Sequence, residues 1–449
     1  MSLRAGAAAA EIPLPSGIQL WGYPHVRRLS TGSHDPLLAS AIVLRNGPVT
    51  LAQIALDVLM LTPPFARNLR RMAARTLEIP EECILISCTH THSGPVCGPI
   101  VAWANDTAAP PPEPAVLDAI ARATILAAQA ACAQLQPAEA AWTTAHISGV
   151  GGNRHDPAAV TDPEAGVLAI RRPGGPLLAV ATIYGMHPTV LHEDSTLTSS
   201  DFPHYARTTL QERFGSGLVV AYHNGPCGNQ SPRHTVNAQT FAETGRIGRQ
   251  FGNLVAKSLE NLPESDFDAD PVLSGKLSLF RPVRRKFPTL VQAERTLAEY
   301  RGTFDRLRQD KATRAEIRTA ECAVFGAEGL VNLARASGDG TLDRLLQDYA
   351  PFEAQALRIG RAGLVGLPGE LFSEYGLAIK SVAPGRVFVT AFTNGELQGY
   401  ITTPDAARAG GYEAAGAVFD CRTGSVLVRA ARKLAREIIL APASRRRRS

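Results

Sequence analysis

The sequence predicts an α/β fold, with a mixed-sheet core, surrounding helices, site loops at the strand ends and an inserted helical segment. Short apolar runs alternate along the chain with helical stretches, the order expected when helices pack against sheets. Four of the apolar runs end abruptly in polar residues that can bind ligands or metals. The charged stretch 289–336 has a helical composition and no strand pattern, which marks it as an insertion.

The predicted strands are apolar runs bounded by turn residues. Two runs within 41–61 flank Asn46-Gly47, a dipeptide typical of a tight hairpin. The other predicted strands are ILISC (84–88), LLAVATIYG (177–185), LVVAYH (218–223), ALRIGRAGLVGL (356–367) and RVFVTAFT (386–393).

Helical periodicity appears in three stretches between these strands. Residues 63–77 carry scattered arginine and alanine, and residues 114–135 are rich in alanine, with apolar positions three and four residues apart. Within 239–262 the apolar side chains on one stripe are Phe241, Ile247, Phe251, Leu254 and Leu259.

The stretch 289–336 predicts a helical hairpin or lid inserted at about 285–340; a surface helical pair without function is the alternative. The chain, 449 residues long, predicts one domain over 1–440. Residues 441–449 predict a basic disordered tail, in which Arg445 to Arg448 supply four positive charges toward a net charge of +5. The body is therefore nearly neutral, which argues against nucleic acid as a partner.

The seven cysteines form no CxxC pair, which predicts free thiols in a reducing compartment. The first residues lack the apolar core of a secretion signal, and no unbroken apolar run reaches the ~18 to 20 residues of a membrane span. We therefore expect a cytoplasmic protein without stable membrane insertion. The sequence leaves a homo-oligomer open.

Histidines follow two of the predicted strands. ILISC runs into Thr89-His90-Thr91-His92, and LLAVATIYG runs into Met186-His187. Residues i and i+2 of an extended segment share a face, so His90 and His92 can present both imidazoles to one pocket. Two histidines with one carboxylate form a known catalytic zinc arrangement, for which His187 and Glu370 supply the further groups. Histidines bonded to nearby carbonyls are the alternative interpretation.

Two other features are weaker when read from the residues alone. Ser231 precedes Pro232 in a glycine-rich loop without the Gly-x-Ser-x-Gly elbow of a nucleophile, and such a serine is usually a turn residue. Tyr400 and Tyr412 lie in a loop-rich region near the C-terminus, where tyrosines normally complete packing.

Taken in order, the motifs resemble the catalytic domain of the neutral/alkaline ceramidase family. The similarity extends from about residue 3 to about residue 430, and Thr89 to Pro95 (THTHSGP) is its most specific segment. The other matching segments are Arg4 to Ala8 with Pro13 and Gly22-Tyr23, Asn153-Arg154, His187-Pro188-Thr189, Asp201-Phe202-Pro203, Asn224-Gly225 through Ser231-Pro232, Pro368-Gly369-Glu370, Thr402-Thr403-Pro404 and Tyr412-Glu413.

The resemblance implies a zinc-dependent amidohydrolase that cleaves the amide bond of a small-molecule or lipid-like N-acyl substrate. The Zn²⁺ ligands that it implies are His90, His187, Glu370 and Tyr412. The other site residues that it implies are His92 beside the metal, Arg154 as a substrate contact and Ser231 as nucleophile or substrate contact. Asp201 and His204 are expected to orient a ligand histidine by hydrogen bonding. The alternative for Asp201 is that it caps a helix.

Several positions depart from the family pattern. Gly228-Asn229-Gln230-Ser231-Pro232 replaces Gly-Asp-x-Ser-Pro, Val96-Cys97-Gly98 replaces a glycine-rich segment, and Ala414 follows Tyr412-Glu413 in place of glycine. The departures leave open a carboxylate-bearing N-acyl substrate held by Arg154, and cleavage of an ester or another C–N bond. Also open are a metal-free serine hydrolase, pairing Ser231 with His92, His187 or His223, and a relative that binds a ligand without catalysis.

Overall fold

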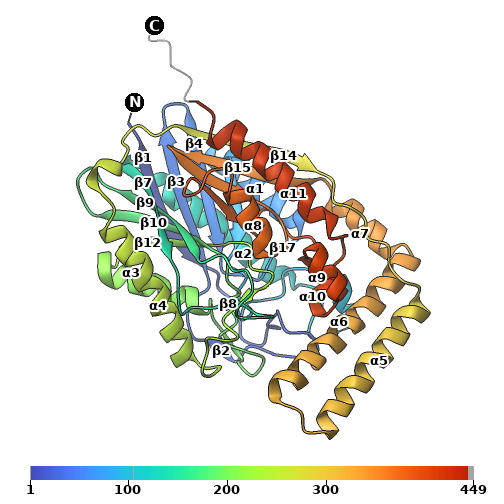
Figure 1. The fold of residues 1–449 in the computed structure, drawn as a ribbon. Helices are drawn as coiled ribbons and strands as arrows, with labels where there is room; N and C mark the ends of the chain where they lie inside the picture. The colour runs from blue at the N-terminus through green and yellow to red at the C-terminus, as the bar shows by residue number, and fades with distance from the viewer. Residues whose placement is uncertain (1, 105, 443–449) are drawn as a thin grey trace.

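The computed structural model describes residues 2–104 and 106–442 (Figure 1). It has the predicted α/β fold, built on three mixed sheets of four or five strands with helices around them. Residues 443–449, most of the predicted basic tail 441–449, lie outside the described residues.

Sheet one contains the first two predicted strands and ILISC. Its strands in spatial order are β5 (Ile84–Cys88), β4 (Val49–Leu56), β3 (Leu38–Asn46), β1 (Arg4–Glu11) and β6 (Gln136–Pro137). β3 and β4 form the predicted antiparallel hairpin, in which Gly47 adopts a positive φ of 60° at the turn. β4 and β5 are parallel, so the sheet is mixed.

Sheets two and three are mixed as well. Sheet two contains, in order, β12 (Val219–Asn224), β10 (Leu177–Tyr184), β9 (Glu164–Arg171) and β7 (Glu139–His146). Sheet three contains β14 (Leu273–Phe280), β15 (Phe352–Ile359), β16 (Ala362–Gly366) and β18 (Val387–Thr390). β10 runs parallel to β12, and β16 runs parallel to β18.

The sequence reading of one long strand over 356–367 was wrong. This segment is a hairpin of β15 and β16 that turns at Gly360, whose φ is +64°. Strands β1, β7, β9 and β14 were not predicted. β1 is mostly alanine, a weak strand former. It forms because all eight of its residues pair with β3, and helix α2 lies close against it, where a Cβ on Gly6 would meet the carbonyl oxygen of Ala131 at 2.0 Å.

The predicted helices form with nearly the expected bounds. They are α1 (Pro63–Leu77), α2 (Pro114–Ala133) and α4 (Phe241–Glu260). α3 (Phe202–Phe214) packs beside α4 on sheet two (Figure 1). α2 is the one helix of the described chain that is long and apolar enough to cross a membrane, and its buried side lies against β1 and β3, as a core helix does.

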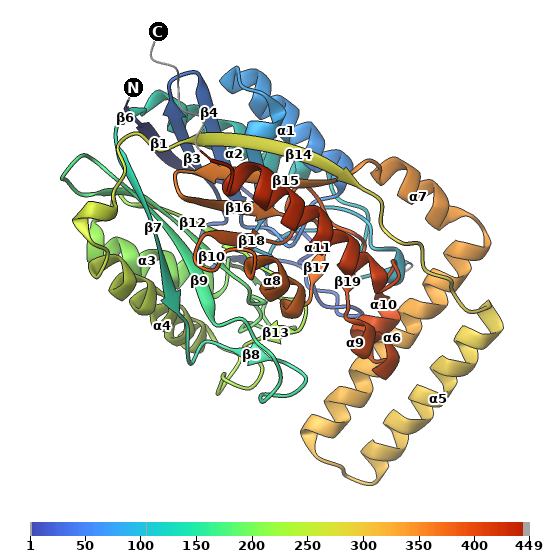
Figure 2. The same cartoon turned by 45° about the horizontal axis from the view of Figure 1, so that its top comes forward.

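The insertion is a helical hairpin, as predicted. α5 (Leu290–Gln309) and α6 (Arg314–Gly338) lie side by side, and α7 (Thr341–Tyr349) follows them. Figures 1 and 2 show the hairpin extending from the edge of the molecule, with α6 toward the body and α5 outside it. Of the α5 side chains only Ala293 is buried, so α6 makes the contacts with the rest of the chain.

The remaining elements are short or lie in the C-terminal part. They are β2 (Gly32–Ser33), β8 (Gly152–Asn153), β11 (Leu197–Thr198), β13 (Gln230–Ser231), β17 (Glu370–Leu371), β19 (Tyr400–Ile401), α8 (Ser373–Lys380), α9 (Pro404–Ala409), α10 (Tyr412–Gly416) and α11 (Arg422–Leu434). The 3-10 turns are Glu81–Cys83, Val101–Trp103 and Glu264–Asp266, and a π-helical turn, Ala435–Ile439, follows α11.

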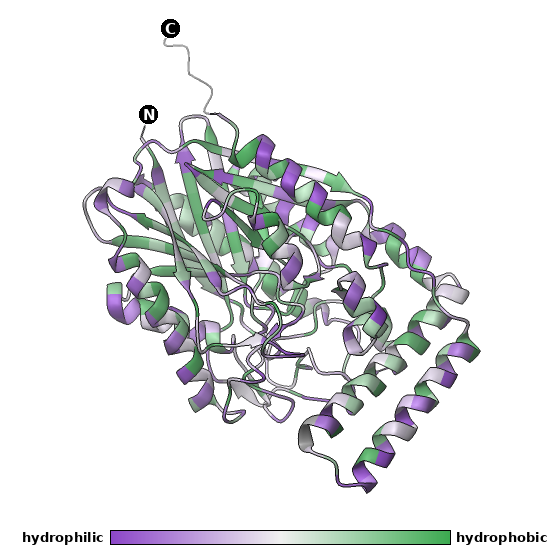
Figure 3. Ribbon diagram, in the orientation of Figure 1, coloured by the Kyte–Doolittle hydropathy of each residue, from purple (hydrophilic) through white to green (hydrophobic). Residues whose placement is uncertain are grey.

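One apolar core joins the three sheets. Ile42 of β3, Leu168 of β9 and Leu357 of β15 belong to the same buried cluster, and Figure 3 shows hydrophobic residues gathered in the sheets. The Trp142 indole N–H crosses between sheets two and three and donates to the carbonyl of Ile359 at 2.9 Å. This rigid core positions the loops that leave β5, β10, β12 and β16.

Candidate metal centre

Three histidines from two separate loops converge at the ends of β5 and β10. His90, His92 and His187 each offer a ring nitrogen, and these nitrogens all lie within 4.8 Å of one another. The Nε2 atoms of His90 and His92 are 3.3 Å apart. The reason given from the sequence was wrong, because β5 ends at Cys88 and His90 has a left-handed φ of 67°. A kinked loop, and not an extended strand, aims the two rings at one point.

Backbone carbonyls determine which ring nitrogen of each histidine carries the proton. The Nδ1 of His90 lies 2.9 Å from the carbonyl of Leu59. The Nδ1 of His187 lies 2.8 Å from the carbonyl of Cys227 and 3.0 Å from that of Gln230. A carbonyl only accepts, so each Nδ1 is the donor and each Nε2 presents a lone pair, the tautomer that binds a metal.

Glu370 faces the same two lone pairs. Its Oε2 lies 3.4 Å from Nε2 of His187 and 3.7 Å from Nε2 of His90. Within the described chain, neither this oxygen nor the His187 nitrogen has a hydrogen-bond partner, although both are buried. Two buried acceptors that face each other without a donor are unfavourable, and a cation between them and Nε2 of His90 would satisfy both.

Burial controls the charge of these groups. It lowers the pKa of His90 to about 3, against a smaller opposing effect of Glu370, so the ring is neutral at physiological pH. Burial alone would raise the pKa of Glu370, but His90, His187 and Arg154 hold it below its usual value. An ionised carboxylate beside the neutral ring of His90 and the Nε2 of His187 is a ligand set that suits zinc.

His92 completes the cluster from the side of the N-terminal loop. Its Nδ1 is buried and has no hydrogen-bond partner among the residues that the structure describes. Gly22, with φ +115°, makes room for the ring, because a Cβ there would meet this nitrogen at 2.5 Å. Burial lowers the pKa of His92 well below its usual value. His92 is therefore a neutral group that can either bind the ion or accept a proton next to it.

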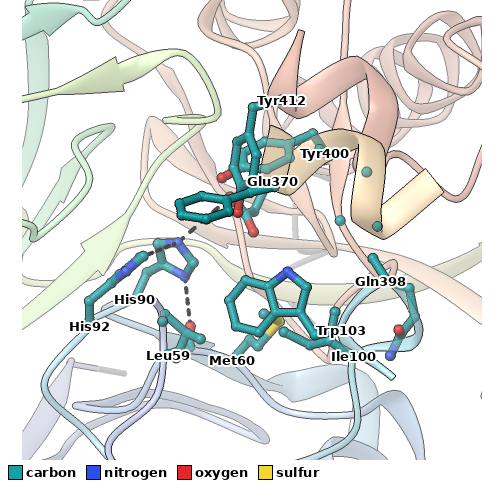
Figure 4. Close-up of a pocket in the computed structure, with 17 residues that line it drawn as sticks. Leu59, Met60, His90, His92, Ile100, Trp103, Glu370, Gln398, Tyr400 and Tyr412 are labelled. Atoms are coloured by element: carbon teal, nitrogen blue, oxygen red, sulfur yellow. Dashed lines mark hydrogen bonds and ion pairs between the residues drawn. The ribbon is translucent and has the colours of Figure 1, made fainter. Parts of the chain in front are cut away.

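Tyr412 and Tyr400 line the same cavity as His90 and Glu370 (Figure 4). The centres of their rings lie 5.8 Å apart. β17 and β19 are parallel neighbours, and Tyr400 lies opposite Glu370 in their backbone register. Burial raises the pKa of both phenols, so both are protonated and able to donate. From the sequence Tyr400 was taken for a packing residue, because no local pattern separates it from other loop tyrosines.

Arg154 is close to the centre, but its guanidinium is held by Glu413. Its Nε donates to Oε1 of Glu413 at 2.8 Å, and its Nη2 lies 2.5 Å from the same oxygen. The guanidinium also lies 5.2 Å from the centre of the Tyr400 ring. Burial opposes ionisation of Glu413, but Arg154 and His155 bring its pKa down to about 2. Glu413 had no role in the sequence reading.

Ser231 lies in β13, which pairs with β8, next to the residue whose carbonyl holds His187. It is 6% exposed, and its Oγ accepts the backbone N–H of Arg233 at 3.3 Å. No histidine of the described chain hydrogen-bonds to this oxygen. His223, one partner considered for it, instead bonds Oγ of Ser87 at 2.7 Å in the buried core.

Asn224 joins the two loops that carry the histidines, and the sequence analysis assigned it no role. Asn224, at the end of β12, donates Nδ2 to the carbonyls of Thr89 (3.0 Å) and Met186 (3.1 Å). Its Oδ1 accepts the N–H of Met186 at 3.1 Å. An asparagine directly after a buried strand, beside two histidine loops, was the available signal.

The capping interpretation holds for Asp201. Its carboxylate accepts the N–H of Phe202 (2.6 Å) at the start of α3 and that of Leu191 (2.9 Å). The expectation that Asp201 or His204 orients a ligand histidine was wrong, because backbone carbonyls bond the Nδ1 atoms of both ligand histidines. The His204 ring lies instead near Asp35, at 3.7 Å.

The candidate centre opens into a narrow cavity with an interior volume of about 50 Å³. Most of its lining is apolar. The lining residues outside the metal cluster and the two tyrosines are Gly22, Leu59, Met60, Ile100, Ala102, Trp103, Phe325, Gly326, Gly329, Gln398, Gly399 and Gly416.

Comparisons with known proteins agree with the resemblance that the sequence motifs indicate. The family model described as "Neutral/alkaline non-lysosomal ceramidase, N-terminal" matches residues 5–245. A neutral ceramidase of Mycobacterium tuberculosis (strain ATCC 25618 / H37Rv) is 24% identical over 456 residues, covering 86% of this chain and 69% of the relative.

Two solved structures share the fold. The neutral ceramidase from Pseudomonas aeruginosa superposes with a TM-score of 0.74 at 18% identity, covering 99% of this chain and 76% of that one. A ceramidase complexed with C2 superposes with a TM-score of 0.72 at 18% identity, covering 99% and 77%.

Proposed function

Because the chain belongs to the neutral/alkaline non-lysosomal ceramidase family, we propose that it is a zinc-dependent hydrolase of an N-acyl amide bond. One observation carries the metal: Nε2 of His187 and Oε2 of Glu370 are buried without hydrogen bonds and lie 3.4 Å apart, and Nε2 of His90 lies 3.7 Å from the same oxygen. Residues 1–440 form the catalytic domain in this proposal.

The ion is held by His90, His187, Glu370 and Tyr412. Zinc in such a site polarises a carbonyl and lowers the pKa of a water toward ~7. The carbonyls of Leu59 and Cys227 keep both imidazoles in the ligand tautomer. Tyr400 lines the same cavity, so its phenol is an alternative fourth ligand or a donor to the substrate carbonyl.

His92 is the proton carrier of the reaction. Its neutral ring is half-buried beside His90, and its buried Nδ1 is free of hydrogen bonds among the described residues. It takes the proton of the attacking nucleophile and returns it to the leaving nitrogen, a role that contributes typically 10² to 10⁴-fold in rate. As a donor to the developing oxyanion it would contribute ~3 kcal/mol.

The nucleophile is either water or Ser231. The Oγ of Ser231 has no histidine partner in the described chain, which favours water. The substitution Ser231→Ala separates the two routes: a water mechanism keeps measurable turnover, and a covalent mechanism loses nearly all of it.

The substrate is a small or lipid-like N-acyl compound, and the family name and the apolar cavity both support it. Arg154 as a fork for a substrate carboxylate is a second candidate role, but the ion pair with Glu413 weighs against it. A relative that binds ligand without catalysis is disfavoured by the intact ligand set. The seven cysteines are all free thiols, which supports a cytoplasmic location.

The metal proposal is tested by metal content and hydrolysis together. We expect about one zinc per purified chain, and loss of both zinc and N-acyl sphingoid base hydrolysis in His90→Ala and Glu370→Ala. His223→Ala is the matched control, because His223 is a buried histidine of the same core that faces no metal ligand in this scheme. Stoichiometric zinc in both ligand variants, or full activity after chelation, would contradict the proposal.

A further inference from the structure

Helix α6 of the insertion forms one wall of the cavity. Phe325, Gly326 and Gly329 line it together with His90 and Glu370. The sequence left two interpretations of the insertion, a lid or an inert surface pair. The lining supports an active role for α6, while α5 covers its outer side (Figures 1 and 2).

Glycines bring α6 close to the site. A Cβ on Gly326 would meet Cα of Tyr412 at 2.9 Å, so the helix lies directly against α10. A Cβ on Gly329 would meet Cβ of Ala102 at 3.4 Å, an ordinary contact that leaves room for a small side chain. The α6 backbone is therefore itself part of the cavity wall.

Polar side-chain contacts hold α6 to two loops around the site. Nε2 of His25 lies 2.7 Å from Oε2 of Glu328, and Nη2 of Arg318 lies 3.3 Å from Oε2 of Glu193. The first loop includes Gly22, which makes room for His92, and the second follows His187. The position of α6 side chains relative to the reacting centre is thus fixed from both sides.

Phe325 is the aromatic side chain that α6 contributes to this wall. Its ring is half-buried and lies 5.1 Å from the ring of His25, whose side chain is 41% exposed. Trp103, from the 3-10 turn, is half-buried and lines the same cavity. Two aromatic side chains therefore border the cavity and are themselves partly open to solvent.

The lining carries no lysine or arginine among its described residues, and Glu370 is its one carboxylate. The polar Gln398 is fully used by the protein: its Oε1 accepts the N–H of Val101 at 2.8 Å, and its Nε2 bonds Pro99 (2.7 Å) and Tyr349 (2.9 Å). The arm of a substrate that occupies this space is uncharged and apolar.

We propose that Phe325 is a specificity-determining residue, which limits the length of the apolar substrate chain that the cavity accepts. This inference rests on the proposed amide hydrolysis. With its phenyl ring in place, an arm that extends past Phe325 must leave the apolar lining. Truncation to alanine opens this end, so added methylene groups gain contact that the native ring denies them.

The test is a length profile with the full chain loaded with zinc. The kcat/KM for N-acyl sphingoid bases with unbranched acyl chains of increasing length is measured for the native protein, Phe325→Ala and the control Phe304→Ala. Phe304 lies on α5, next to Arg308 and outside the cavity lining, so it reports loss of a phenyl ring from the insertion alone.

We expect Phe325→Ala to shift the preference to longer chains. Each further buried methylene adds about 4-fold, so two or three raise the long-to-short ratio of kcat/KM about 15- to 60-fold. Gly329→Ala narrows the cavity from the same helix and should shift the preference to shorter chains. Phe304→Ala should keep the native profile.

An unchanged profile in Phe325→Ala, or the same shift in Phe304→Ala, would overturn the specificity role while leaving amide hydrolysis intact. If the native protein cleaves no N-acyl compound, the proposed function fails instead. Calorimetric binding of straight-chain fatty acids of increasing length then tests the cavity independently. The length dependence should again change in Phe325→Ala and not in the control.

Discussion

Replacing Gly22 by alanine should move His92 without touching a metal ligand of the proposed site. The Cβ of an alanine at position 22 would stand 2.5 Å from Nδ1 and 2.6 Å from Cγ of His92, both impossible contacts. The backbone there has φ +115°, which costs a non-glycine residue about 1 to 3 kcal/mol. The ring must therefore shift, while His90, His187 and Glu370 keep their positions.

Gly17 provides the control for backbone strain. It has a similar positive φ of 89°, but a Cβ there meets no heavy atom within 4 Å. We expect Gly17→Ala to lose about 1 to 3 kcal/mol of unfolding free energy and to keep its kcat. We expect Gly22→Ala to lose at least as much stability, to keep its zinc, and to lower kcat about 10- to 100-fold, which is ~1.4 to 2.7 kcal/mol of barrier.

The assay combines thermal unfolding, zinc content and kcat for the two variants. Equal kcat values in Gly22→Ala and Gly17→Ala would refute the proton-carrying role of His92. Loss of zinc from Gly22→Ala alone would instead make His92 a metal ligand.

Three further outcomes are expected. Asn224→Ala leaves polar groups of both histidine loops unpaired, so we expect urea unfolding to show a loss of about 2 to 3 kcal/mol in unfolding free energy. Competition titration should show weaker zinc binding, and an unchanged zinc affinity would contradict this role. Arg246 and a backbone N–H hold the pKa of Glu243 at about 2, below its unfolded value, so the stabilisation is present above pH ~4.5 and is lost as pH falls toward 2. Glu243→Gln should therefore lower stability at pH 7 by at most ~1 kcal/mol. In thermal melts across a pH series, the variant should lose less stability than the native protein as the pH falls from ~4.5 toward 2. An equal loss in both would exclude the Glu243–Arg246 pair as a cause of the acid sensitivity. Tyr412→Phe should weaken zinc binding, whereas Tyr400→Phe should lower kcat with zinc retained; the reverse pattern would make Tyr400 the phenol ligand.

Much of the fold could be read from local pattern. The hairpin at Asn46-Gly47, strand ILISC and the helices at 63–77 and 114–135 were predictable because apolar periodicity and turn residues act over a few positions. β1 was not, since its alanines form a strand through pairing with β3 and close packing of a helix on them.

The sequence by itself determined which side chains follow the buried strands, and so which chemistry the chain can offer: imidazoles, a carboxylate and phenols in an order that resembles one family. Only the tertiary structure decided how they meet. The carbonyl of Leu59 selects the tautomer of His90 from 31 positions away, and Glu413 takes the guanidinium of Arg154 across 259. Such contacts depend on packing between distant segments, and no local spacing encodes them.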